Sequence, residues 1–446
     1  MTDANETHSA RRNRRLRAAF ISSFISKVGS VLVQIFAFPA AVASLGPKAF
    51  GAYASTVAAV SWVSLVSLGA PPSLTRLISA AVGRDDREQE SLLFGNGLAV
   101  SVAAGMLAAI LILKTATMED LPHLLGPSVM GFEHAARTVL YILSLFIPLT
   151  LVGNVAEATY SAYQEQAITN SWSFVLSLIS IPVLLLVVRW PLISVMVVGT
   201  YGPTALTKLL SLVQLVALRR PYLLRGIRRI SWSASKSLLL PGGAFALISA
   251  GSYLNTQLPI FVAGWTGGTA AAQMGILMQM YTIAISVAVM VNNTLWPALI
   301  EAKQRNDFRW LAKALRHAVS VNAIVAAGSL VGLGVLTPVI ASRWYRVPLS
   351  HPEATAWAMG AFMAAATFEN MLIAISYGIG SLRRAAAVFV IRCAIAACLY
   401  RLLAFRFGIP GILAVGAVTA LAACVALGLP YVRARSANDG AEGPSS

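Results

Sequence analysis

Residues 92–113 read LLFGNGLAVSVAAGMLAAILIL, an apolar run without a charged side chain. One helical crossing of a bilayer needs ~20 apolar residues, because the hydrocarbon layer is ~30 Å thick and a helix rises ~1.5 Å per residue. The run therefore predicts a membrane-spanning helix. Similar runs recur from residue 18 to residue 433, separated by short polar breaks.

Composition extends this prediction to the whole chain. Hydrophobic residues make up 57% of the 446, charged residues 11%, and the mean hydropathy is +0.72. A soluble chain of this length carries more charge on its surface. A transmembrane barrel would show alternating segments of ~10 residues, which this sequence lacks. We predict an all-α polytopic membrane protein with about 12 transmembrane helices.

The predicted spans fall into two groups of six. They are 18–45, 50–80, 92–114, 136–160, 166–188, 190–217, 237–264, 270–298, 316–342, 352–378, 384–405 and 410–433. The basic break 218–236 is expected to be a cytoplasmic linker between an N-lobe, 18–217, and a C-lobe, 237–433. Residues 1–17 form a basic cytoplasmic tail in this prediction, and 434–446 a disordered cytoplasmic tail.

The charge distribution predicts the orientation. The net charge is +17, and the basic residues collect in the breaks between spans. Those in breaks assigned to the cytoplasm outnumber those on the other side, as the positive-inside rule requires. We therefore expect cytoplasmic N- and C-termini. This placement favours topology and anionic membrane lipid as the explanation of the charge, and no nucleic-acid partner is expected.

Seven charged residues fall within or at the edge of apolar runs, where each costs ~2.5–3.5 kcal/mol at a helix centre unless it pairs or lines a wet cavity. They are Lys27, Arg76, Glu157, Lys208, Glu369, Arg392 and Arg401. The excess of cations suits an anionic ligand. Lys27 and Arg76 have the alternative of reaching the interface with their long side chains. Glu369 is the best candidate for a proton or cation relay, with Glu157 the second, and structural ion pairing is the alternative.

Enzyme signatures are missing from the sequence. The five histidines lie in tails, loops or span edges without metal-ligand spacing, and no phosphate-binding Walker loop is present. The three cysteines lie in apolar runs without metal spacing. We expect no catalytic residue, no metal and no cofactor.

Several segments resemble bacterial polysaccharide flippases of the multidrug, oligosaccharidyl-lipid and polysaccharide exporter superfamily. These segments are ASLGPKAFGAY at 43–53, LGAPPSLTR at 68–76, AYQEQAITN at 162–170, WPALIEAKQRND at 296–307 and GIPGI at 408–412. Their order and spacing match over most of the chain, from about residue 18 to 433. Drug-exporting relatives typically carry an acidic residue in the first span, whereas this sequence has Lys27 there.

The resemblance implies two six-helix lobes around a central cavity, in the inner membrane of a bacterium. It also implies movement of a polyprenyl-diphosphate-linked oligosaccharide from the cytoplasmic to the outer leaflet, for a surface polysaccharide such as O-antigen or exopolysaccharide. Polysaccharide polymerase or export proteins are then possible partners. The candidates for binding the diphosphate and glycan are the five buried cations Lys27, Arg76, Lys208, Arg392 and Arg401, of which only Arg76 lies in a matching segment.

Three alternatives remain at this point. A proton- or sodium-coupled exporter of small molecules would need an essential carboxylate at Glu369 or Glu157. A membrane glycan polymerase or glycosyltransferase would need a catalytic loop on the outer side, which the sequence does not show. A major-facilitator transporter is suggested only by GRDDR at 83–87, without the later residues of that motif.

Overall fold

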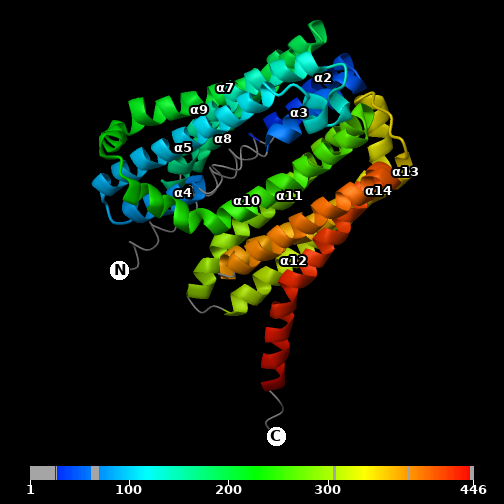
Figure 1. The fold of residues 1–446 in the computed structure, drawn as a ribbon. Coiled ribbons are helices and arrows are strands. Elements are labelled where there is room, and N and C mark those ends of the chain that lie inside the picture. The colour runs from blue at the N-terminus through cyan, green and yellow to red at the C-terminus, as the bar shows by residue number, and fades with distance from the viewer. Residues whose placement is uncertain are drawn as a thin grey trace. The chain divides into compact units, whose positions relative to one another are not determined.

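The computed structural model describes residues 26, 28–61, 70–163, 165–304, 308–379 and 382–441, and within these ranges the chain is helical with no strand (Figure 1). The elements are η1 (Val33–Ala37), α2 (Phe38–Leu45), α3 (Pro47–Ser61), α4 (Ala70–Val82), α5 (Arg87–Ala116), α6 (Leu121–Leu125), η3 (Pro127–Val129), α7 (Glu133–Ala162), α8 (Gln166–Arg189), α9 (Ile193–Val213), η4 (Gln214–Arg219), η5 (Pro221–Arg229), α10 (Trp232–Thr266), α11 (Gly268–Gln304), α12 (Phe308–Val339), η6 (Ile340–Trp344), α13 (Pro352–Ile379) and α14 (Leu382–Ala441).

The helices confirm the predicted fold class, an all-α polytopic membrane protein. Within the described ranges, nine helical stretches are long and apolar enough to cross a membrane. Each of the twelve predicted spans overlaps a helix. The last two spans lie within the single long element α14, which is interrupted at Gly408 by a non-helical backbone with φ 60° and ψ −145°. Glycine adopts a positive φ at little cost. Because Gly408 lies between the two predicted spans, 384–405 and 410–433, the break in α14 separates them.

The two ends of the chain differ in what the structure describes. The basic tail 1–17 lies outside the described residues, as does Lys27. At the other end, α14 is helical as far as Ala441 and so extends into the tail 434–446, for which disorder was expected. Alanine and arginine, which recur just after Tyr431, are good helix formers, so a preceding helix can continue through them.

The chain divides into two compact units. The first consists of the residues up to Leu124 together with Val129–Ala246, and the second of Leu125–Ser128 together with the chain from Leu247. In the first unit α7 packs against α5, α9 and α4, and α8 packs against α9. In the second unit α13 packs against α11, α12 and α14 (Figure 1). The boundaries predicted for the N-lobe, linker and C-lobe stay a prediction.

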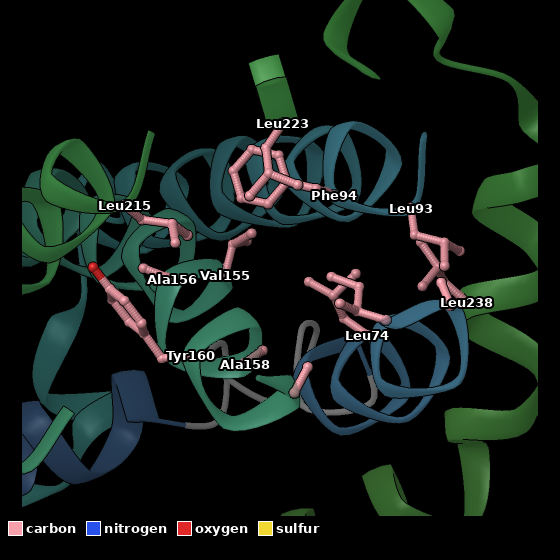
Figure 2. Packing of buried hydrophobic residues seen from close by; sticks show 13 residues of the cluster. Leu74, Leu93, Phe94, Val155, Ala156, Ala158, Tyr160, Leu215, Leu223 and Leu238 are labelled. Carbon is pink, nitrogen blue, oxygen red and sulfur yellow. The ribbon is translucent and has the colours of Figure 1, made fainter. Parts of the chain in front are cut away.

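A connector, defined here as η4 and η5 (residues 214–229), follows α9 and folds back onto the first unit. Leu223 of the connector is fully buried in the same apolar cluster as Phe94 of α5 and Val155 of α7 (Figure 2). Gly226 lies directly on the backbone of α5: a Cβ built at Gly226 would be 1.7 Å from the carbonyl oxygen of Ser91. Only a residue without a side chain fits this contact, so the connector is docked tightly on α5.

We predict that Gly226→Ala destabilises the protein by about 1–3 kcal/mol, the usual cost of overpacking a filled site. The neighbour it meets is backbone, which cannot rotate away. The matched control is Gly328→Ala on α12, where an added Cβ meets nothing within 4 Å. Thermal unfolding of the purified protein in detergent should show a lower Tm for Gly226→Ala only. Equal Tm values for the two variants would contradict the docked connector.

Candidate functional site

The first unit contains a polar cavity of about 310 Å³. Its lining is Ser26, Ser30, Glu157, Ser161, Gln166, Thr169, Asn170 and Ser173. All of these are polar, and Glu157 is the one charged residue among them. Hydroxyl and amide groups both donate and accept hydrogen bonds, so the cavity can bind a ligand that has many groups of both kinds.

Helical spacing explains why these side chains converge. Gln166, Thr169, Asn170 and Ser173 of α8 follow one another at intervals of three, one and three residues, which places them on one face of the helix. Ser173 Oγ donates a hydrogen bond to the Thr169 carbonyl oxygen, at 3.0 Å, and its lone pairs remain available as acceptors. The buried hydroxyl of Thr169 has no hydrogen-bond partner among the described residues.

A cation and an anion meet at the edge of this cavity. Lys208 Nζ of α9 donates hydrogen bonds to Glu157 Oε2 and Asn154 Oδ1 of α7, both at 2.6 Å. Gly153 allows the two helices to approach this closely, because a Cβ there would lie 2.5 Å from Lys208 Cβ. The Glu157 side chain is 40% exposed and that of Lys208 is 20% exposed. The pair is therefore charge-compensated, and its glutamate is accessible from the cavity.

A second ion pair lies in the second unit and is almost dry. The guanidinium of Arg392 on α14 donates to the Glu369 carboxylate on α13, and the two side chains are 3% and 4% exposed. Arg392 also donates to Asn255 Oδ1 of α10, at 2.9 Å. The second oxygen of Glu369, Oε1, is buried and has no hydrogen-bond partner among the described residues. Glu369 therefore has one acceptor atom left for a proton or a cation.

The structure brings four of the seven singled-out residues together in two pairs, Lys208 with Glu157 and Arg392 with Glu369. Arg76 on α4 and Arg401 on α14 have exposed side chains, with no ion pair or hydrogen bond among the described residues. Lys27 lies outside those residues. Sequence reasoning missed the polar cavity, although the spacing of polar residues along 166–173 carries its signal. It also missed Asn255, which nothing in the sequence marks as the partner of Arg392.

The sequence profile of a family described as polysaccharide biosynthesis protein matches residues 16–303 of this chain. The chain is also 23% identical to the uncharacterized membrane protein EpsK of Bacillus subtilis (strain 168) over 318 residues, which is 71% of this chain and 62% of that protein. The match thus spans less than two thirds of that relative's length.

Solved structures show the same fold. An inward-facing multidrug resistance MATE family transporter of the MOP superfamily matches with a TM-score of 0.74 and 14% identity, over 94% of this chain and 100% of that one. The eukaryotic MATE transporter AtDTX14 matches with a TM-score of 0.72 and 14% identity, over 95% of this chain and 96% of that one. A MOP superfamily transporter from Pyrococcus furiosus matches with a TM-score of 0.62 and 15% identity, over 94% of this chain and 96% of that one. It is described as having a binding pocket of reverse polarity that suggests a different function.

We predict that the Glu369–Arg392 pair shows strong coupling in a double-mutant cycle. Glu369→Gln leaves a buried guanidinium without its counter-ion and should cost about 3–5 kcal/mol. Replacing both residues, by Glu369→Gln and Arg392→Gln, should cost clearly less than the sum of the two single changes. The loss of stability of each single variant and of the double variant is measured by thermal unfolding in detergent.

The matched control is the cycle of Glu157→Gln and Lys208→Gln, whose pair is partly exposed and therefore weakly coupled. Additive losses at Glu369 and Arg392, equal in size to those of the control cycle, would contradict a dry ion pair in the second unit.

Proposed function

This chain belongs to the family of polysaccharide biosynthesis proteins, and from this premise we propose that it is a flippase for a polyprenyl-diphosphate-linked oligosaccharide. It moves this lipid from the cytoplasmic to the outer leaflet of a bacterial inner membrane, for a surface polysaccharide such as O-antigen or exopolysaccharide. The activity is transport by alternating access. Polysaccharide polymerase or export proteins that use the translocated lipid are its proposed partners.

The polar cavity of the first unit is the observation that carries this proposal. A glycan has many hydroxyl groups, and each one that leaves water without a new partner costs free energy. The cavity offers hydroxyl and amide groups from helices α7 and α8, which are otherwise apolar enough to cross a membrane. Such a lining replaces water for a neutral sugar. An apolar drug would instead leave these polar groups unpaired.

The diphosphate needs positive charge, and we propose Lys27, Arg76, Lys208, Arg392 and Arg401 as candidates to supply it. Arg76 and Arg401 are both exposed without a carboxylate partner among the described residues, and Arg76 ranks first because it lies in the unit that contains the polar cavity. Lys208 and Arg392 each have their charge balanced by a glutamate. Either cation reaches a phosphate only if that pair opens or the glutamate is protonated.

The two glutamates are proposed to couple flipping to an ion. A carboxylate that gains a proton or sodium ion releases its hold on the paired cation, which then becomes available to the diphosphate. Glu369 is the first candidate because Oε1 is unpartnered among the described residues, and Glu157 is the second.

A second candidate function is a proton- or sodium-coupled exporter of small molecules. The same unpartnered oxygen of Glu369 supports it, as does the fold shared with multidrug transporters. The Pyrococcus furiosus structure is described as having a pocket of reverse polarity, so one fold accommodates pockets of different charge. The two functions differ in which residues are essential.

We predict that Arg76→Gln lowers the appearance of lipid-linked glycan in the outer leaflet by about tenfold or more, the loss expected for one charge-assisted hydrogen bond to phosphate. The assay uses a strain that lacks the wild-type gene and scores surface glycan by lectin binding and mass spectrometry. Membrane abundance of each variant is measured in parallel. Arg189→Gln, another exposed arginine within a helix (α8), is the matched control and should export normally.

Normal glycan export by Arg76→Gln would remove Arg76 from the proposed site. The exporter hypothesis predicts a different pattern, in which Glu369→Gln abolishes drug efflux while Arg76→Gln has no effect. Because both variants are tested in both assays, one set of strains separates the two functions.

A further inference from the structure

The connector has three distinct faces, because η5 is a 3₁₀-helix with about 3.0 residues per turn and residues three apart lie above one another. Leu223 and Gly226 form a buried face. Leu224 and Ile227 form an apolar face, continued by Ile230 just after the helix. Arg225 and Arg228 form a basic face. No acidic residue occurs between positions 214 and 236.

The buried face is held firmly on the first unit. Ser91 Oγ of α5 donates to the carbonyl oxygens of Tyr222 and Leu223, at 3.2 and 3.3 Å. The Tyr222 hydroxyl donates to Glu90 Oε2 at 2.5 Å, and Tyr163 donates to the same atom at 2.5 Å. Burial, and then the bond to Glu90, raises the pKa of Tyr222 above its ordinary value. The other two faces are therefore presented in a fixed orientation.

The apolar face is exposed. Leu224, Ile227 and Ile230 are 43%, 38% and 51% exposed. Leu218 before η5 and Trp232 after it are exposed at 78% and 77%. Burial of apolar side chains stabilises by ~25 cal/mol per Å² of apolar surface removed from water, and side chains left in water do not gain this free energy. Because η5 directly follows a helical stretch, Ile193–Arg219, that is long and apolar enough to span a membrane, the acyl chains at the membrane boundary are within reach of this face.

The basic face is available for a ligand, unlike the arginines at the two ends of η5, Arg220 and Arg229. Arg220 is engaged by Glu165 through two hydrogen bonds, at 2.9 and 2.8 Å, and Arg229 is paired with Glu88. Arg225 and Arg228 are exposed and have no hydrogen bond or ion pair among the described residues. Two unpaired guanidinium groups beside an apolar face match a phosphate headgroup above its acyl chains.

We propose that the connector is a binding site for the headgroups of acidic phospholipids, with Leu224, Ile227 and Trp232 at the acyl boundary and Arg225 and Arg228 on the phosphates. Charge complementarity selects acidic over zwitterionic lipid, because the face carries cations and no anion. The apolar face selects a lipid over a soluble phosphate. A lipid bound here holds the connector between the membrane surface and α5.

Native mass spectrometry of the full chain, titrated with phosphatidylglycerol or phosphatidylcholine, tests the site. The double variant Arg225→Gln, Arg228→Gln is expected to weaken phosphatidylglycerol binding about tenfold or more, since each arginine near an anionic surface contributes to the attraction. The matched control is Arg189→Gln, Arg343→Gln, which removes the same charge from two exposed arginines elsewhere and should bind normally.

Equal loss in both double variants, or equal binding of the two lipids by the wild type, would overturn the proposal. Inorganic pyrophosphate serves as the soluble competitor. Displacement of phosphatidylglycerol by pyrophosphate at equal concentration would also overturn it and assign the arginines to a soluble phosphate.

Spin labels supply a measurement that does not depend on affinity. Cysteines introduced singly at positions 224, 225, 227 and 228, in a chain whose three native cysteines are replaced, are labelled in phosphatidylglycerol-containing nanodiscs. Labels at 224 and 227 should be relaxed by oxygen, which concentrates in lipid, and labels at 225 and 228 by a water-soluble nickel complex. Higher access of the nickel complex at 224 and 227 than of oxygen would overturn the membrane placement.

Discussion

The hydrocarbon layer offers no hydrogen bonds, and this one constraint accounts for most of the structure. Backbone groups in it must be satisfied within the chain, which dictates helices. The same constraint acts on side chains: the ionised residues Arg392 and Glu369 occur inside the second unit as partners. Hydroxyls such as Thr159 donate to a carbonyl four residues earlier in their own helix. Buried polar groups without a hydrogen-bond partner among the described residues, such as the Thr169 hydroxyl, are exceptions and therefore informative.

The two ion pairs answer this constraint in different ways. Glu369 and Arg392 exclude water, so their attraction is strong and the penalty for separating them is large. Glu157 lines the polar cavity, and both Glu157 and Lys208 are partly exposed, so water or a ligand can replace one partner at lower cost. A site that must bind and release a substrate needs the second kind of pair. The first kind is suited to hold helices together until an ion neutralises the carboxylate.

Sequence reasoning reached the spans because each one is a local property, the length of an apolar run. It also found the charges that burial makes costly, including Glu369 and Arg392. Pairing of Glu369 with Arg392 or Arg401 could be suggested from the sequence, but Asn255 could not, since the Arg392–Asn255 contact joins residues far apart in the chain. The three faces of the connector also depend on a non-local fact. The sequence alone identifies the run 221–229 only as basic. The contact of Gly226 with Ser91 of α5 decides which side of the run is buried.

The charge balance of the polar cavity bears on how the proposed substrate, a lipid-linked glycan, would be recognised. A free cation beside the cavity would attract any anion in the surrounding water, including soluble phosphates and nucleotides. Compensation of Lys208 by Glu157 removes that attraction and leaves a lining that favours neutral hydroxylated groups. In the proposed flippase, while the Lys208–Glu157 pair is closed, the diphosphate would be recognised elsewhere, by cations such as Arg76. Under this proposal, dividing recognition in this way would make tight binding depend on sugar and diphosphate together, so that neither a soluble sugar nor a soluble phosphate alone would occupy the transporter.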